Sequence, residues 1–516
     1  MSQAEHHTPP TFSLGVLIIL TLALALSTFM QVLDTTIANV SIPSIAGDLA
    51  VSPNQGTWVI TAFAASNAIT MPLTGWLAGR FGEVRLFVAS TLLFSLTSWL
   101  CGVAPTFPLL VLARILQGVA AAPMMPLSQS LLLSIYPEHK KGLALAFWSM
   151  TATTAPIAGP LLGGYITDNY HWPWIFYINL PIGIIGSFLV WRFLREHESE
   201  IRIRPIDLLG LALLIVGVSA LQIMLDKGND LDWFESSTII ILTAVAVIAL
   251  TFFVIWELFH PHPVVDLTLF SKRNFTVGTV TISLGYAIFL GGGVVFPLWL
   301  QTQMGYTAFW AGAASALVGI FAFLLSPVVG ANLHRVDLRL IVTTGFSIFA
   351  ISYYWASLYT PDADFMTIAM PRLILGAGMA MYFIPLTTIL LAGVEPYRIA
   401  SAMGLVNFLR VLGGGFGTSL AMALWEHRTT LHYANLTENV SIFHPQVVLT
   451  LNVIKEAGIS AYAWLDRAIV SQASLRASDD IFLMSSYSFL ALIVLVWFAK
   501  PPFLSKRKEA TPPVLE

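Results

Sequence analysis

The chain has 516 residues, of which 56% are hydrophobic and only 10% are charged, and its formal net charge is −3. Soluble domains carry about 25% charged residues, so this composition excludes a soluble globular protein and indicates an integral membrane protein. The single Cys101 excludes an internal disulfide. No nucleic-acid partner is expected, whereas membrane lipid is.

Apolar runs of about 20 residues follow one another along the chain, and each is long enough to cross a bilayer once as a helix. Runs of this length argue against a β-barrel, whose strands are short and alternate. The runs predict an all-α membrane protein with fourteen spans. The predicted spans are about 14–37, 55–78, 86–104, 107–134, 143–167, 174–194, 206–226, 237–258, 276–299, 308–330, 338–357, 366–392, 400–424 and 480–499.

Basic residues are distributed unevenly between the two sides of this arrangement. Most of the 25 Lys and Arg residues fall in loops or span ends on the side of the two termini, for example Arg80, Lys140 and Arg195. Lys227 is the basic residue of the short loops on the other side, and four more lie in one long loop there. This asymmetry predicts that both termini are cytoplasmic. No removable signal peptide is expected.

An internal repeat divides the chain into two halves. The fourth predicted span has Arg114 and Gly118 four residues apart, followed by Pro126, and the twelfth has Arg372, Gly376 and Pro385. Related halves are typical of secondary transporters, whose sites lie between them. We therefore expect a six-helix half, a linker with two inserted helices and a second six-helix half. The boundaries are 1–195, 196–275 and 276–516, with a long extracytoplasmic loop at about 425–479.

Several motifs resemble the major facilitator superfamily, and within it the fourteen-span drug:proton antiporters of the EmrB type. The first-span signature is Leu33-Asp34-Thr35-Thr36-Ile37-Ala38-Asn39. Gly75 to Gly82 is similar to the loop motif after span two, and Arg114 to Gly118 to the fourth-span motif. Ala155 to Gly164 is similar to the fifth-span motif of exporters. The resemblance covers nearly the whole chain, and together these motifs are highly specific.

This resemblance implies a major facilitator fold and export driven by the proton gradient across a bacterial inner membrane. The implied substrates are small amphipathic drugs or toxic compounds. The implied partners are a periplasmic adaptor and an outer-membrane channel, which complete a tripartite pump. No cofactor is implied, because the chain has no Gly-x-x-x-x-Gly-Lys-Ser/Thr loop for ATP. No catalytic or metal motif is present either, so an enzyme is not expected.

Asp34 is the candidate proton-coupling residue, with Arg114 as its partner. A charge inside a span costs roughly 2.5 kcal/mol or more and usually marks an ion or proton path. Burial disfavours the charged form of a carboxylate and a nearby cation favours it, so changing surroundings would change its affinity for protons. The alternative follows from its place about 27 Å beyond Val16 at 1.5 Å per residue, which is near the outer interface. There it would be a polar helix end in water, and Arg114 would be structural.

Further polar and small residues lie within the spans. Asn39, Arg372, Asn407 and Arg410 are candidates for either coupling or structural stabilisation. Gly159, Pro160, Gly163 and Gly164 predict a packing and hinge element, because proline kinks helices and small residues let them approach.

Methionine and aromatic side chains suit varied apolar cargo and mark a candidate substrate cavity. The alternative for each is a position facing lipid or another helix. The candidates are Met124, Met125, Trp148, Met150, Tyr286, Phe289, Tyr382, Phe383 and Phe408.

Two further alternatives stay open. Val447 to Arg476 has a helix-forming composition, and its segment either docks the adaptor or caps the last two spans. The chain either exports many amphipathic toxic compounds or exports one endogenous metabolite, such as a siderophore or a fatty acid, since the same motifs would serve both.

Overall fold

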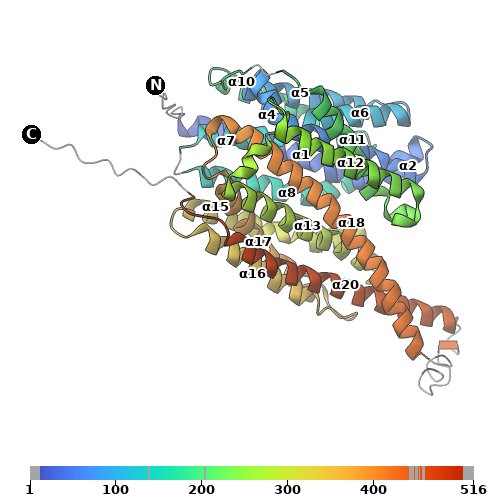
Figure 1. The fold of residues 1–516 in the computed structure, drawn as a ribbon. Coiled ribbons are helices and arrows are strands. Elements are labelled where there is room, and N and C mark those ends of the chain that lie inside the picture. Colours follow the sequence, from blue (N-terminus) through green and yellow to red (C-terminus); the bar gives the residue numbers. More distant parts are fainter. Residues whose placement is uncertain are drawn as a thin grey trace, which may run out of the picture.

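The computed structural model describes residues 12–137, 140–202, 205–440 and 460–503, together with 447, 451, 454 and 455. Every regular element in these ranges is a helix, which confirms the predicted all-α class for the described part of the chain. The long helices lie side by side in one bundle, and α18 and α20 extend beyond the others at one end (Figure 1).

The first part of the chain forms helices that pack mainly on one another, with α1 against α8 and α10, and α3 against α6. These elements are α1 (Leu14–Asp48), α2 (Pro53–Gly56), α3 (Trp58–Thr70), η1 (Met71–Leu73), α4 (Thr74–Phe81), α5 (Glu83–Gly102), α6 (Phe107–Ala121), α7 (Met124–Ile135), α8 (Lys141–Asn169), α9 (Trp174–Tyr177) and α10 (Asn179–Leu194).

The remaining helices form the pair that we predicted to be inserted and the second part of the bundle. The predicted inserted pair is α11 (Leu208–Lys227) and α12 (Ser237–Phe259), with the short turns η3 (Asn229–Leu231), η4 (Trp233–Glu235) and η5 (Leu267–Ser271). The second part is α13 (Arg273–Thr302), α14 (Ala308–Ala316), α15 (Val318–Asn332), α16 (Leu338–Ala356), α17 (Phe365–Leu391), η6 (Pro396–Arg398), α18 (Ile399–Asn439) and α20 (Ala461–Val496).

Polar side chains cap several of these helices at their first turn. Asp207 accepts a hydrogen bond from the Gly210 amide, and Asp364 accepts one from the Thr367 amide. Such caps satisfy amides that have no partner within the helix. The apolar runs between caps then cross the bundle as helices, because backbone groups in lipid must be paired internally.

Among the described residues, eleven helices are long and apolar enough to cross a membrane. The fourteen predicted spans are therefore not all established. The other three, at 55–78, 143–167 and 338–357, fall on α3 to α4, on α8 and on α16. The count of fourteen stays a prediction.

Two predicted span ends and the long loop need correction. Helix α1 continues through Pro43 to Asp48, beyond the predicted end at 37. The predicted loop at 425–479 is largely helical where it is described, since α18 continues to Asn439 and α20 begins at Ala461. The two extensions contact each other, with Trp425 donating to Ser478 at 2.9 Å and His432 bonded to Asp480 at 2.8 Å. Most of 441–459 lies outside the described residues.

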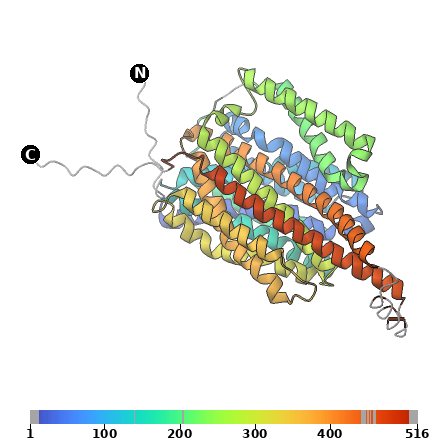
Figure 2. The same cartoon turned by 60° about the horizontal axis from the view of Figure 1, so that its bottom comes forward.

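Both ends of the described chain lie at the same end of the bundle, which we call the terminal side (Figure 2). The Phe12 ring contacts the His197 ring, at 5.1 Å between ring centroids. Near the C-terminus, Arg273 donates to the Phe498 carbonyl at 2.6 Å. The loops predicted to be cytoplasmic therefore gather with the termini. Which side of the membrane they occupy stays a prediction.

Ion pairs hold the terminal-side loops. Lys272 donates to Glu395 at 2.7 Å, and this hydrogen bond lowers the pKa of the Glu395 carboxyl. Arg339 binds Asp337 at 2.7 Å and likewise lowers the pKa of that carboxyl. Both carboxyls are partly exposed, so these pairs contribute modestly to stability.

Glycines let the two parts of the bundle touch on the terminal side. A Cβ on Gly330 of α15 would lie 2.5 Å from the Gly142 carbonyl oxygen and 2.7 Å from the Ala146 Cβ, both on α8. A Cβ on Gly75 would meet Ser401 at the start of α18. Only glycine permits these approaches, so the helices are in close contact at these two points.

We expect Gly330→Ala to destabilise the protein, because the added methyl would overlap with α8. Overpacking of this kind costs about 1–3 kcal/mol. The control is Gly293→Ala, where nothing lies within 4 Å of the added Cβ. Both variants gain the same helix propensity, so unfolding of the purified proteins by heat isolates the clash. Equal unfolding temperatures for the two variants would contradict the close contact.

Candidate functional site

A buried ion pair joins α1 to α6 inside the first part of the bundle. Arg114 donates from Nη1 to Asp34 Oδ2 at 2.5 Å, and both side chains have 0% exposure. Arg114 Nε also donates to the Val59 carbonyl oxygen on α3 at 2.9 Å. Its guanidinium lies 4.3 Å above the centroid of the Phe63 ring. The pair therefore ties three helices together.

Amide side chains surround the other carboxylate oxygen. Asp34 Oδ1 accepts from Gln117 Nε2 at 3.2 Å and from Asn179 Nδ2 at 3.1 Å. Both amides also donate to Ser98 Oγ on α5, each at 2.9 Å. In each of these contacts the neighbouring group donates the hydrogen bond to Asp34, and an ionised carboxylate can only accept hydrogen bonds. The cage is thus complementary to a negative charge.

Small residues position α1 for this site. Gly159 of α8 lies against Thr36, and a Cβ on Gly163 would lie 2.8 Å from the Ile37 carbonyl oxygen. These contacts flank Asp34, so the glycines of the exporter-like motif allow α8 to approach α1. Helix α8 runs unbroken through them. Gly159 and Gly163 lie in close contact with α1, while a packing and hinge element formed by Gly159, Pro160, Gly163 and Gly164 stays a prediction.

The structure excludes the alternative that Asp34 is a polar helix end in water. Its side chain is fully buried, and the helix continues for 14 residues to Asp48. The distance of about 27 Å beyond Val16 gives the position of Asp34 along the helix, but it does not show which groups surround the side chain. Here those groups come from α6 and α10, which enclose the carboxylate.

Chemically, the Asp34 carboxylate can either form the ion pair with Arg114 or bind a proton. If Asp34 were protonated, Arg114 would lose its counter-charge. It would keep only neutral acceptors, the Val59 carbonyl and Gln117 Oε1, the latter at 2.7 Å. Its Nη2 is already buried without a hydrogen-bond partner. Protonation would therefore weaken the link between α1 and α6.

The repeat-related Arg372 lies in a different environment. Its Nη2 donates to the Gly292 carbonyl oxygen at 3.4 Å, and its guanidinium lies 3.7 Å from the Phe296 ring centroid. No ion pair forms at Arg372 within the described ranges. Asn39, on α1, is exposed and takes no part in the Asp34 cage. Neither residue is brought to the ion pair.

Asn407 and Arg410 instead lie where α18 meets α7, between the two parts of the bundle. Asn407 Nδ2 donates to Gln129 Oε1 at 2.7 Å, and Arg410 Nη2 contacts Met125 Sδ at 3.0 Å. Phe383 stacks on Trp148 across the same junction, with centroids 5.3 Å apart.

The nine cavity candidates do not all lie together. Met125, Trp148, Tyr286 and Phe383 gather around Arg410 at this junction. Four others pack within one part of the bundle or contact their own neighbours. Met124 is buried beside Phe63 and Phe94. The Tyr382 hydroxyl donates a hydrogen bond to the Ile282 carbonyl oxygen, and the Phe289 ring contacts the Phe349 ring. Phe408 is 7% exposed. Met150 is half-buried on α8.

Three residues of the cage were not singled out from the sequence. Gln117 lies one turn after Arg114, and Asn179 is an amide at the start of an apolar helix. An amide within a span is a signal that could have found both. Ser98 gives no such signal, because small hydroxyls are common in membrane helices.

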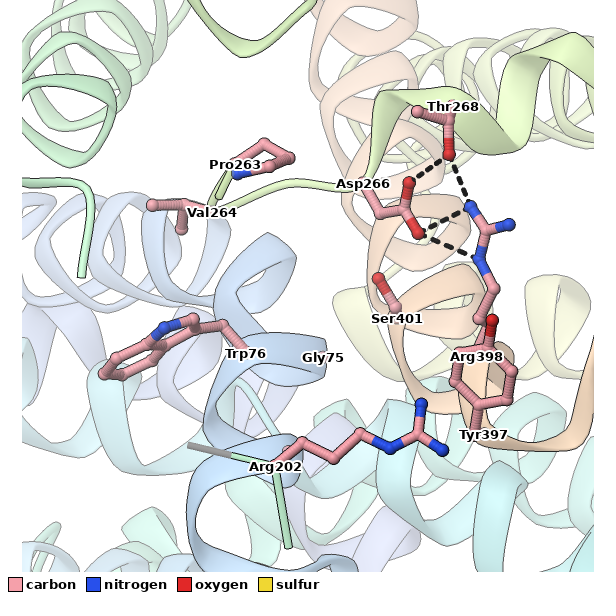
Figure 3. Close-up of a pocket in the computed structure, with 11 residues that line it drawn as sticks. Gly75, Trp76, Arg202, Pro263, Val264, Asp266, Thr268, Tyr397, Arg398 and Ser401 are labelled. Carbon is pink, nitrogen blue, oxygen red and sulfur yellow. Dashed lines mark hydrogen bonds and ion pairs between the residues drawn. The ribbon is translucent and has the colours of Figure 1, made fainter. Parts of the chain in front are cut away.

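A separate cavity of about 310 Å³ lies on the terminal side, between α4, the linker and the start of α18 (Figure 3). Arg398 pairs with Asp266 at 2.6 Å beside it, and the Arg202 guanidinium lies 4.3 Å from the Tyr397 ring centroid. The cavity shares no lining residue with the Asp34 cage. It marks where the linker and both parts of the bundle meet.

Comparisons with known proteins place this geometry in context. Residues 24–418 match the sequence profile of the Major Facilitator Superfamily. The chain is 50% identical to the multidrug export protein EmrB of Haemophilus influenzae over 96% of this chain and 98% of that one. It is 48% identical to the fatty acid resistance protein FarB of Neisseria gonorrhoeae, over 94% and 96% of the two chains. The crystal structure of the human organic anion transporter MFSD10 has the same fold at 12% identity, with a TM-score of 0.60 over 93% of this chain and 98% of that one.

We expect Asp34→Asn to destabilise the protein strongly, because it leaves Arg114 buried without a counter-charge. Breaking a buried pair costs about 3–5 kcal/mol. The double variant Asp34→Asn with Arg114→Gln removes both charges and should recover much of this loss. Unfolding of the purified proteins measures the coupling. Additive losses in the double variant would show that the two charges do not interact.

Proposed function

Because the chain belongs to the Major Facilitator Superfamily, we propose that it is a proton-coupled exporter of amphipathic toxic compounds. The fully buried Asp34–Arg114 pair is the observation that carries the proton-coupling part of this proposal. The 50% identity to a multidrug export protein over nearly the whole chain supports the substrate class.

Alternating access would proceed by rocking of two six-helix halves, 1–195 and 276–516, around a site between them. In this proposal all fourteen predicted helices cross the membrane, and 196–275 supplies the inserted pair. The terminal side is closed by the contacts of Gly142 with Gly330 and of Gly75 with Ser401. Substrate would therefore leave on the opposite side in this state and enter after the terminal side opens.

The proton would act by breaking the ionic contact between α1 and α6. Protonation of Asp34 from outside removes the charge that holds Arg114, and release of the proton inside restores the pair. The energy source is the proton gradient, with no further cofactor. A ligand or proton can shift such an equilibrium only by binding the two states differently. The change in the Arg114 contact provides that difference.

In the cell we place the protein in a bacterial inner membrane with both termini in the cytoplasm. The helical extension of α18 and α20 would then project into the periplasm (Figures 1 and 2). We propose that this extension contacts a periplasmic adaptor, which connects it to an outer-membrane channel. Its exposed residues, such as Tyr462 with 72% exposure, are available for that contact.

The transport proposal predicts that proteoliposomes accumulate an amphipathic dye when their lumen is more acidic than the bath. A proton leaving the acidic lumen would drive the dye inward. In the cell, a proton entering the cytoplasm would drive the drug outward in the same way. Asp34→Asn should reduce this accumulation to the level of empty liposomes, while the variant is still inserted. The Asp34→Asn, Arg114→Gln variant controls for lost stability. Accumulation by both variants at the wild-type rate would contradict the role of Asp34.

The same assay separates the two candidate cargoes. An exporter of many toxic compounds should move several unrelated dyes and drugs. The name of the relative FarB supports testing a fatty acid as a single endogenous substrate. Movement of a fatty acid alone would favour the metabolite exporter.

The adaptor proposal predicts that a photo-crosslinking amino acid at Tyr462 captures a periplasmic protein in cells. The control position is Tyr487 of α20, which is 61% exposed but lies in the part of the helix within the bundle. Crosslinking at Tyr487 and not at Tyr462 would contradict docking at the extension.

A further inference from the structure

Arg410 is a buried cation with unused hydrogen-bonding capacity. It lies on α18 at the junction between the two parts of the bundle and is 6% exposed. The contact of its Nη2 is with Met125 Sδ at 3.0 Å, and a thioether is a weak acceptor. Its Nε is buried without a hydrogen-bond partner. No carboxylate forms an ion pair with it anywhere in the described ranges.

Such an arrangement is costly unless an anion completes it. A guanidinium is always charged, and a buried charge needs a counter-charge or strong acceptors. Arg114 meets this need with Asp34 at 2.5 Å. Arg410 has no equivalent, although it lies where the halves meet and a substrate would pass. The missing group is therefore one that a bound molecule can bring.

Aromatic rings around Arg410 define the rest of the site. Its guanidinium lies 5.1 Å from the Tyr286 ring centroid and 5.2 Å from that of Phe383. Phe383 is stacked on Trp148 at 5.3 Å. Trp148 and Met125 belong to the first part of the bundle, and Tyr286 and Phe383 to the second. A flat apolar body can pack against these rings with its charged end at Arg410.

We propose that Arg410 binds the anionic group of an amphipathic weak acid, a carboxylate in the simplest case. The aromatic cluster of Trp148, Tyr286 and Phe383 holds the apolar body of the same molecule. This inference rests on the proposed export function and assigns its substrate class. Arg410 is then the residue that favours anions over neutral molecules of equal shape.

The proposal has a consequence for the energy source. Export of an anion in exchange for one proton moves two charges across the membrane in the same electrical sense. Export of a monovalent cation in exchange for one proton moves none. Transport of a weak acid should therefore respond to the membrane potential as well as to the pH gradient, whereas exchange of a cation should respond to the pH gradient alone.

The experiment uses three probes with one aromatic body: 9-anthracenecarboxylate, its carboxamide and 9-(aminomethyl)anthracene. Their binding to the full-length protein in nanodiscs is followed by fluorescence at a pH where the acid is ionised. We expect wild type to bind the carboxylate more tightly than the amide. Arg410→Gln should weaken carboxylate binding about tenfold to hundredfold, as expected for a lost hydrogen bond to a charged group, and change amide binding less than twofold. Arg410→Lys should retain the preference for the anion.

The binding measurements test the role of Arg410, and the transport assay tests the export function separately. Equal binding of carboxylate and amide by wild type overturns the assignment without any variant. An equal loss for all three probes in Arg410→Gln also overturns it, because a structural role would produce that. If the pH gradient drives no transport in proteoliposomes, the export function fails. The binding comparison still tests Arg410 in that case.

Discussion

The Asp34–Arg114 ion pair is the interaction that constrains the first half of this protein. Two charges at 0% exposure among apolar helices are stable only if each satisfies the other. The carboxylate therefore needs its three donors, and the guanidinium needs the Val59 carbonyl as well. Helices α1, α3, α6 and α10 supply these groups. Any change in the charge of Asp34 therefore alters contacts made by all four helices.

The second half uses its related arginine differently, and this asymmetry separates two tasks. Arg372 is enclosed by aromatic rings and a carbonyl, so it carries no comparable ionic link. The cation that faces the junction is Arg410, one helix further along the chain. In the proposed function, proton exchange at Asp34 and substrate binding at Arg410 would then occupy different helices. On the terminal side, Gly142 and Gly330 bring α8 and α15 into close contact, which leaves no space for a larger side chain at Gly330.

Much of the site follows from the sequence because charges in apolar spans are expensive and therefore conspicuous. Asp34 and Arg114 stand out for that reason, and so do Arg372 and Arg410. The amides Gln117 and Asn179 cost less to bury and are easily overlooked. Composition also does not distinguish Met124 from Met125. Met124 packs inside the first part of the bundle, whereas Met125 contacts Arg410. That difference depends on the rotation of α7, which is set by packing. The predicted first span ends at about 37 because the apolar run ends there, yet the helix continues through Pro43 to Asp48.

Infrared difference spectroscopy of the Asp34 carboxyl group is the most direct test of the central claim. The C=O stretch of a protonated carboxylic acid is absent from a carboxylate, so it reports the protonation of this residue. We predict that acidification of the wild-type protein produces an acid band that is missing in Asp34→Asn. Addition of an exported compound should then diminish that band as the proton is released. A spectrum without an Asp34-dependent band, with or without the compound, would contradict the account.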